Sequence, residues 1–271
     1  MELRFRPMNL KAGRPIAFVN KLFAKKMNIH EGGRIEAVYR GKKAIIIANI
    51  MGNFVREDEI SFSDEAAAYF NLERGAKIRV NIPLEPLSTQ LILKKLNKKE
   101  LKNEEIHIII RDIVNNALSE TEIAYFVSAV YENGMTMRET IALTEAIATT
   151  GKIMKWKEKI AADKHSIGGI PGNRTTPIVV SICAAAGIII PKTSSRAITS
   201  AAGTADTIET IANVNLSYSE LIRVVEKTGA CLAWGGSLGL APADDKLIRV
   251  ERLLNLDPEP QLIASIMAKK H

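Results

Sequence analysis

The sequence is poor in the residues that would indicate disulfides, metal sites or a membrane. Its only two cysteines, Cys183 and Cys231, lack the spacing of metal ligands, which favours reduced thiols in a cytoplasmic protein. No apolar run reaches the roughly eighteen residues of a transmembrane helix, so we expect no membrane partner. The N-terminus alternates charged and apolar residues and lacks the continuous apolar segment of a secretion signal.

Aromatic residues are also scarce, at 5% of the chain, although the net charge is +7. Excess positive charge suits either a nucleic acid or a small anionic substrate. The densest basic run, between Lys94 and Lys102, has no interleaved aromatic residues on which bases could stack. We therefore interpret this run as a solvated helix face and expect no nucleic-acid partner.

The length of 271 residues allows about two or three domains. The first 82 residues have the sequence pattern of short strands and turns. Residues 34–40 and 43–47 flank Gly41-Lys42 and predict a hairpin. Residues 27–35 align with residues 70–78 at a constant offset of 43, keeping an asparagine, a glycine and an isoleucine in register. This repeat predicts a small β-barrel with internal pseudo-symmetry.

Helical signals follow a linker marked by two prolines, Pro83 and Pro86. Thr136 and Glu139 have the spacing of a capping box, as do Ser119 and Glu122. Gly134 and Gly151 stand where C-terminal caps are expected. These signals predict a helical bundle over residues 87–155.

From residue 159 onward, strand and helix signals alternate. We expect helices at 177–186, 206–212, 219–227, 243–254 and 261–270, with strands at 188–190 and 231–234. Such alternation indicates a mostly parallel sheet covered by helices, with ligands bound at the carboxyl ends of the strands.

The whole pattern predicts a multidomain α/β chain with a small N-terminal β-barrel. Residues 1–84 are expected to form a barrel-like domain, to which the resemblance described below gives a role in assembly, and residues 85–158 a helical domain on which residues 243–271 pack. Residues 159–242 form the first part of a mixed or parallel α/β phosphate-binding domain.

A glycine-rich loop at residues 164–176 is a candidate phosphate site. Its glycines let backbone N–H groups approach an anion, and the helix that follows presents its positive end. Lys164 adds a full charge, and Ser166 and Thr176 add hydroxyl donors. The loop matches neither the Walker pattern nor the dinucleotide-binding fingerprint. Composition alone leaves a structural turn as an open alternative.

A second polar loop, residues 194–204, follows a predicted strand and precedes a predicted helix. Its Arg196 can hold a phosphate or a carboxylate through two parallel hydrogen bonds. An ordinary strand–helix connection is the alternative. A third set, on the last helices, carries little weight by itself because charged residues on short helices are usually solvated. That set is Asp244, Asp245, Arg249, Arg252, Asp257, Ser265 and Lys269.

Together these segments resemble a known family. The string Lys164-His165-Ser166-x-Gly168-Gly169, with Ser194 and the Gly203-Thr204 pair downstream, is similar to that of the thymidine phosphorylase-like (pyrimidine nucleoside phosphorylase) family. Residues 240–244 and 265–270 match it further. The loop is one residue longer than the usual bacterial one, and a barrel precedes the helical domain. Both departures resemble the archaeal AMP phosphorylase branch.

The resemblance implies phosphorolysis of AMP, and of CMP or UMP, to free base and ribose 1,5-bisphosphate. Inorganic phosphate would be the co-substrate, without a cofactor or a metal, in a homo-oligomer that is a dimer or larger. It implies Asp257 as proton donor to the base. Family chains continue well past residue 271, so we expect a truncated form whose activity is open.

The resemblance also implies two binding sets. Arg196 and Thr199 are assigned to the 5′-phosphate of the nucleotide, and His165 either contacts ribose or orders its loop. Neither Arg249 nor Arg252 is assigned, because neither fits the spacing of the base-binding arginine in pyrimidine enzymes. The inorganic phosphate set is Lys164, His165, Ser166, Thr176, Ser194 and Thr204. The AMP set is Gly168, Ser194, Ser195, Arg196, Ala197, Ile198, Thr199, Gly203, Thr204, Ser265 and Lys269.

Three alternatives remain open. A thymidine or uridine phosphorylase would not require a 5′-phosphate. A phosphoribosyltransferase of the anthranilate type would need acidic residues for Mg²⁺, and residues 169–173 contain no carboxylate. A truncated chain could also be a non-catalytic assembly module built on the barrel and the helical bundle.

Overall fold

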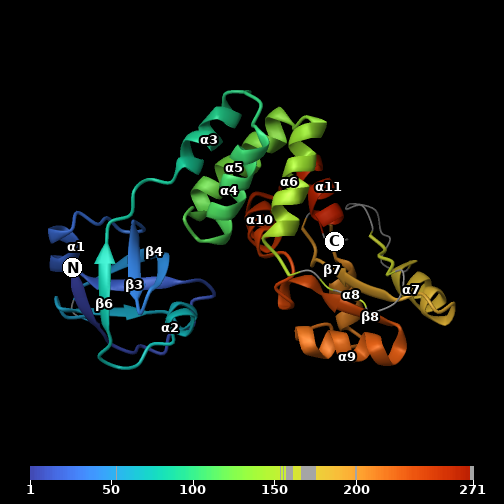
Figure 1. Ribbon diagram of the computed structural model, residues 1–271, viewed down its shortest axis with the longest axis horizontal. Coiled ribbons are helices and arrows are strands. Elements are labelled where there is room, and N and C mark those ends of the chain that lie inside the picture. Colours follow the sequence, from blue (N-terminus) through green and yellow to red (C-terminus); the bar gives the residue numbers. More distant parts are fainter. Residues whose placement is uncertain are drawn as a thin grey trace. The chain divides into compact units, whose positions relative to one another are not determined.

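The computed structural model describes residues 1–271 except 53, 153, 155, 157–160, 166–174, 199 and 269–271. The chain divides into two compact units, Met1–Thr89 with Asn115–Ser119, and Gln90–Val114 with Glu120–His271. Figure 1 labels their helices and strands. Within the described ranges, no helix is long and apolar enough to cross a membrane.

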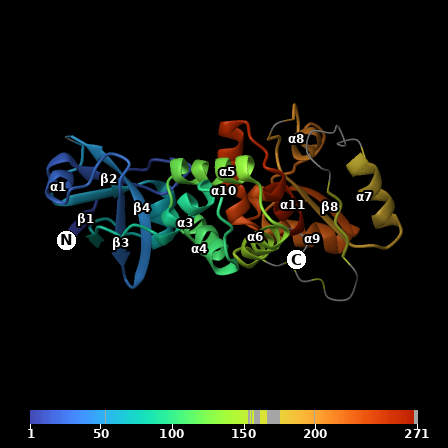
Figure 2. The same ribbon diagram turned by 90° about the horizontal axis from the view of Figure 1, so that it is seen from above.

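The first unit contains a closed six-stranded barrel with strand order β1-β5-β2-β4-β3-β6. Strand β1 runs parallel to β5 and β2 runs parallel to β4, and the other neighbours are antiparallel. Figure 2 shows β1 to β4 from above. The elements are β1 (Glu2–Phe5), β2 (Ile16–Asn20), α1 (Lys21–Lys26), β3 (Arg34–Tyr39), β4 (Lys42–Met51), β5 (Glu59–Phe62), α2 (Asp64–Phe70) and β6 (Lys77–Asn81).

The predicted repeat is present in the barrel. The units β2-α1-β3 and β5-α2-β6 each have a left-handed asparagine after their helix: Asn28, φ 54°, follows the C-cap of α1, and Asn71, φ 53°, is the C-cap of α2. Each then turns at a glycine of positive φ, Gly32 or Gly75, before the next strand. Because asparagine and glycine are the residues that most readily adopt this conformation, their recurrence fixes both helix ends.

The barrel core follows from period-two alternation along its strands. In β6 the burial alternates, with Ile78 and Val80 inward, and β1 buries Leu3 and Phe5 in the same way. The rings of Phe5 and Phe62 stack at 5.9 Å between centroids. Burial of each such side chain stabilises the folded state by about 1.5–3 kcal/mol. The apolar faces of these strands therefore point into the barrel and form its core.

The second unit contains the helical bundle. Helix α4 places Ile106, Ile109, Ile110 and Ile113 at i, i+3, i+4 and i+7, and all four are fully buried. Helix α11 lies beside α6 in both views, and α10 packs on α5 and α4 (Figures 1 and 2). The helices are α3 (Leu87–Leu96), α4 (Asn103–Val114), α5 (Glu120–Asn133), α6 (Met137–Thr149), α10 (Pro242–Leu254) and α11 (Glu259–Ala268).

The predicted cap at the start of α6 is confirmed, but one predicted cap at its end is wrong. Thr136 and Glu139 form a capping box with bonds of 3.2 and 2.8 Å. The C-cap is Thr150, with right-handed geometry. Gly151 serves packing instead, since a Cβ there would lie 1.7 Å from the carbonyl oxygen of Leu240. A glycine is required because two backbones meet.

A partly buried lysine connects α10 to the end of α4. The Nζ of Lys246 donates to the carbonyl oxygens of Ile113 and Val114, at 2.8 and 2.7 Å. These carbonyls belong to the last turn of α4 and lack partners within the helix. Burial, reinforced by the charge of Arg249, lowers the pKa of Lys246 to about 8. The contact holds one face of α10 on the bundle and leaves another face available.

The rest of the second unit is an α/β segment around two parallel strands. Residues Ile190 to Ser194 pair in register with Ala230 to Trp234, and Ala161 forms a bridge to Ile189. The elements are α7 (Thr175–Ala185), β7 (Ile190–Ser194), α8 (Thr204–Glu209), α9 (Tyr218–Thr228), β8 (Ala230–Trp234) and the 3-10 turn η1 (Gly235–Ser237). The predicted fold class of barrel, bundle and partial α/β domain is confirmed.

The strand predicted at 188–190 is displaced. Strand β7 begins at Ile190, because the N–H groups of Gly187 and Ile188 close the end of α7 through bonds to Ala184 and Cys183. The helix predicted at 206–212 also shifts, to Thr204–Glu209. Both shifts move the ends of these elements toward the polar loop that follows β7.

Candidate active site

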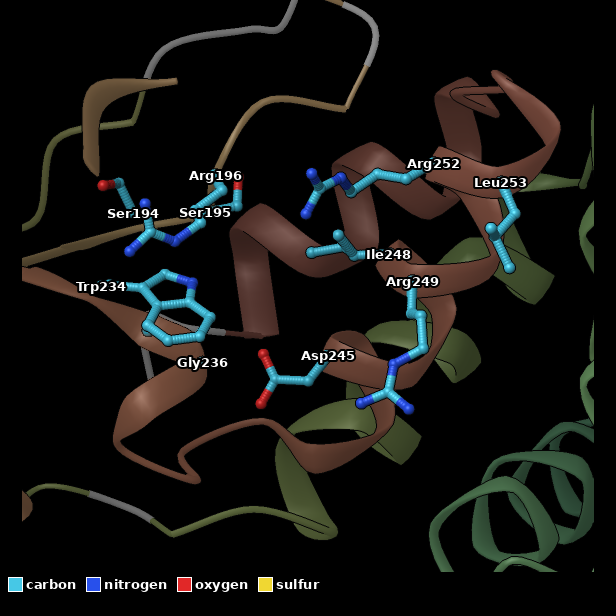
Figure 3. A pocket seen from close by; sticks show the side chains of 11 residues that line it. Ser194, Ser195, Arg196, Trp234, Gly236, Asp245, Ile248, Arg249, Arg252 and Leu253 are labelled. Atoms are coloured by element: carbon cyan, nitrogen blue, oxygen red, sulfur yellow. The ribbon is translucent and has the colours of Figure 1, made fainter. Parts of the chain in front are cut away.

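A cleft of about 480 Å³ opens at the carboxyl ends of the two parallel strands. Ser194 and Trp234 are the last residues of β7 and β8 and are register partners. Helix α10 supplies the opposite wall (Figure 3). This is the position at which parallel α/β sheets bind ligands. The lining residues are Ser194, Ser195, Arg196, Trp234, Gly235, Gly236, Asp245, Ile248, Arg249, Arg252 and Leu253.

Arg196 lines the cleft, and its positive charge is already paired with two carboxylates. Its guanidinium donates to Asp206 at 2.9 Å and to both carboxylate oxygens of Glu209 at 2.6 and 2.8 Å. It also stacks over the ring of Trp234, 4.8 Å from the centroid. The hydrogen bonds that Arg196 donates to Glu209, and then to Asp206, raise the pKa of Arg196 above its usual value. The residue is thus held rigidly in place.

Asp206 connects the two ends of the loop that contains Arg196. One of its oxygens accepts from the backbone N–H of Ala197 and of Gly203, each at 2.9 Å. Burial raises the pKa of Asp206, but these bonds and Arg196 outweigh it, so the pKa lies below the ordinary value. A Cβ at Gly203 would lie 2.8 Å from the Ala197 nitrogen. Only glycine allows so close a crossing.

The indole of Trp234 rests on the turn that follows β8. A Cβ at Gly236 would lie 2.6 Å from this ring, so glycine is needed for the ring to lie flat there. The ring in turn supports the guanidinium of Arg196. Backbone and aromatic ring together form the floor of the cleft.

Two predicted phosphate residues are brought together beside α7. The Nζ of Lys164 donates to the hydroxyl of Thr176 at 2.9 Å, although twelve residues separate them. Thr176 is fully buried in the first turn of α7. Burial lowers the pKa of Lys164, with Asp163 opposing the shift. A cation beside a helix N-terminus is a suitable place for an anion.

The remaining predicted residues are distributed around this region. His165 contacts the carboxylate of Asp163, and its predicted role stays a prediction. Thr204 is buried at the start of α8, and Ala197 and Ile198 lie in the loop between β7 and α8. Ser166, Gly168, Thr199 and Lys269 lie outside the described residues.

Asp257 follows α10 and is partly buried, and burial raises the pKa of its carboxyl group. Ser265 belongs to α11. Neither residue lines the cleft described above. A carboxyl group that stays protonated above its usual range is suited to donate a proton.

Among the residues that the structure describes, no group of three or more His, Cys, Asp or Glu side chains could hold a metal ion. The expectation of a reaction without metal or cofactor stays a prediction.

Comparisons with known proteins identify the family. Residues 89–151 match the glycosyl transferase family helical bundle domain, and residues 158–256 match the a/b domain of that family. The whole chain is 46% identical to an AMP phosphorylase of Pyrococcus furiosus and 44% identical to one of Thermococcus kodakarensis, covering 54% of each relative. The chain belongs to this glycosyl transferase family and is similar to its AMP phosphorylases.

The chain spans about half the length of the AMP phosphorylases that it matches. A relative from Methanococcus aeolicus is 51% identical over 199 residues, which is 73% of this chain and 40% of that protein. Among solved structures, the anthranilate phosphoribosyltransferase of Thermus thermophilus matches with a TM-score of 0.54 and 20% identity, over 66% of this chain and 54% of that one. The likeness to the anthranilate phosphoribosyltransferase shows a shared fold alone.

Eight residues of the cleft were not assigned from the sequence, although the AMP phosphorylase resemblance covered their segment. They are Gly235, Gly236, Leu253, Trp234, Asp245, Ile248, Arg249 and Arg252. The last four are spaced i, i+3, i+4 and i+7, which places them on one face of α10. That spacing is visible in the sequence, but it cannot show that this face meets the ends of β7 and β8.

Proposed function

We propose that this protein cleaves AMP, and other nucleoside 5′-monophosphates such as CMP and UMP, with inorganic phosphate. The products are the free base and ribose 1,5-bisphosphate. The observation that carries the proposal is the cleft at the ends of β7 and β8 in a chain that is similar to AMP phosphorylases. Inorganic phosphate is the co-substrate, and no cofactor is required.

The nucleophile is a phosphate oxygen, which attacks C1′ of the ribose as the bond to the base breaks. Lys164, Thr176 and Ser166 hold this phosphate, together with Ser194, Thr204 and His165. The contact between Lys164 and Thr176 supports this role, because it sets a cation and a hydroxyl beside the first turn of α7. Fixing the phosphate in this way supplies the advantage of proximity.

The electron pair of the broken bond departs with the base, which needs a proton to leave as a neutral molecule. Asp257 is the donor in this proposal. Burial raises the pKa of its carboxyl group, which favours the protonated form that a general acid must have. In the same proposal, Ser265 and Lys269 contact the base.

The nucleotide occupies the cleft along the loop after β7. Its binding set is the predicted one, from Ser194 to Thr199 with Gly168, Gly203 and Thr204. The rigid attachment of this loop through Asp206 supports the assignment, since a preformed site loses less entropy on binding. Assembly as a dimer or larger homo-oligomer, the cytoplasmic location and the lack of a nucleic-acid partner stay predictions.

The test is a phosphate-dependent assay on the 271-residue chain and on a longer relative, supplied with AMP, CMP, UMP, adenosine or thymidine. Free base and sugar phosphate are both measured. We expect release of base from nucleoside monophosphates only when inorganic phosphate is present. Equal turnover of thymidine and nucleotides would indicate a nucleoside phosphorylase instead. A large assembly of either chain without turnover would favour a structural module.

Within this assay, Lys164→Ala should raise the phosphate concentration needed for half-maximal rate by roughly tenfold or more, because it removes a charge-assisted contact. The apparent affinity for AMP should change much less. An unchanged dependence on phosphate would show that Lys164 does not hold it.

A further inference from the structure

The face of α10 that lines the cleft carries two arginines near its C-terminal end. Arg249 and Arg252 are one turn apart, both are solvent-exposed, and both line the cleft. In Figure 3, Arg252 extends from α10 toward Ser195 and Arg196 on the opposite wall. Both guanidinium groups add positive charge to the cleft, although Figure 3 shows that of Arg249 pointing away from that of Arg252.

The cation on the opposite wall is less suited to an anionic ligand. Arg196 is shared between Asp206 and Glu209, so the cluster carries a net charge of −1 from one cation and two carboxylates. A phosphate placed on Arg196 would lie beside both carboxylates and would be repelled by them. By contrast, neither Arg249 nor Arg252 forms an ion pair with another residue of the described part of the chain.

The same helix face also carries a carboxylate at a suitable separation. Asp245 precedes Arg252 by seven residues, or about 10 Å along a helix axis. A nucleotide has a phosphate at one end and hydroxyl donors on the adjoining sugar. The arrangement of charges along α10 matches that order, with cations for the phosphate and an acceptor farther along.

We propose that Arg249 and Arg252 bind the 5′-phosphate of the nucleotide and so distinguish nucleotides from nucleosides. Arg196, which belongs to the predicted nucleotide set, then acts as a positioning residue that holds the loop between β7 and α8 and does not contact the 5′-phosphate. This assignment rests on the proposed function and specifies the residues that select its substrate. Arginine suits the task because its planar group donates two parallel hydrogen bonds to phosphate oxygens.

The experiment measures binding by isothermal titration calorimetry, so that it does not depend on turnover. The ligands are AMP, adenosine and inorganic phosphate alone. The full chain is compared with Arg249→Gln, Arg252→Gln, the double variant and a control, Arg223→Gln. Arg223 is an exposed arginine of α9 outside the cleft. Circular dichroism verifies that each variant keeps its fold.

We expect the wild-type chain to bind AMP more tightly than adenosine. Each single substitution should weaken AMP binding by about tenfold or more, since each removes a charge-assisted contact. Adenosine and inorganic phosphate should bind as before, and the double variant should lose the preference for AMP. The control should behave as the wild type.

Two results would overturn the inference while leaving the proposed function intact. One is a double variant that still prefers AMP. The other is a loss of inorganic phosphate binding with AMP binding retained, which would show that the arginines of α10 bind inorganic phosphate and not the 5′-phosphate of the nucleotide. A wild-type chain with no preference for AMP over adenosine would instead refute the proposed function, and the inference with it.

Discussion

Replacing Asp206 with alanine tests whether this carboxylate holds the loop of the candidate site. The change removes the acceptor of two backbone N–H groups, at Ala197 and Gly203, each 2.9 Å away. A buried donor left without a partner costs about 1–3 kcal/mol, and these partly buried amides belong at the lower end. The lost ion pair adds about 0–1 kcal/mol, because Arg196 keeps Glu209. The expected loss is about 2–4 kcal/mol of local stability.

Amide hydrogen exchange at Ala197 and Gly203 measures this loss directly, because both N–H groups lose their acceptor. A loss of about 2–4 kcal/mol corresponds to exchange that is faster by roughly 30-fold to 900-fold. The matched control is Glu209→Gln, which removes an exposed carboxylate from the same guanidinium and should accelerate exchange only slightly. Equal effects of the two substitutions would refute the reasoning.

The pH dependence of the same amides gives a second test. The pKa of Asp206 is lowered in the folded chain, so its contribution to stability is complete above the ordinary value near 4. That contribution is lost as the pH falls through the lowered pKa. Protection of Ala197 and Gly203 should therefore decline on the acid side of about pH 4 in the wild type, and should show no such decline in Asp206→Ala.

Three further predictions concern the catalytic acid and the packing of the second unit. Asp257→Asn should lower turnover by roughly two to four orders of magnitude with little change in AMP affinity. Since burial raises the pKa of Asp257, the wild-type rate should fall with pH at values above those of an ordinary aspartate, a profile that steady-state kinetics can measure. Gly151→Ala should lower the free energy of unfolding in urea by at least about 2 kcal/mol, because the added Cβ would lie 1.7 Å from the carbonyl oxygen of Leu240. An unfolding free energy close to that of the wild type would contradict the close approach of the two backbones. The pKa of Lys246 is lowered to about 8, so between pH 8 and pH 10 the folded chain has lost a proton that the unfolded chain still binds. The unfolding free energy of the wild type should therefore rise by up to about 3 kcal/mol over that range. Lys246→Met should lack this rise.

Several features follow from the sequence because they depend on residues close together in the chain. The cap of α6 needs only Thr136 and Glu139, three residues apart. The barrel repeat is visible because Asn28 and Asn71 impose the same left-handed turn wherever they stand. Family membership also follows from local strings such as Lys164-His165-Ser166, and the comparisons confirm it.

The candidate site depended more on distant contacts. From the sequence, Arg196 was predicted to bind a phosphate, and the structure gives its charge two carboxylate partners ten and thirteen residues away. Arg249 and Arg252 were left unassigned, because helical spacing defines a face but not what lies opposite it. Gly151 was taken for a helix cap, because nothing near it in the sequence shows the backbone of Leu240.

The sequence by itself therefore determined the order of barrel, bundle and α/β segments, the capping box of α6, the barrel repeat and the family. Those features are set by dihedral preferences and hydrogen bonds that act within about four residues of each other. Only the tertiary structure decided that the ends of β7 and β8 face α10 across a cleft, and which arginine there is already paired. These contacts form only when segments far apart in the chain pack together, so no local sequence pattern predicts them.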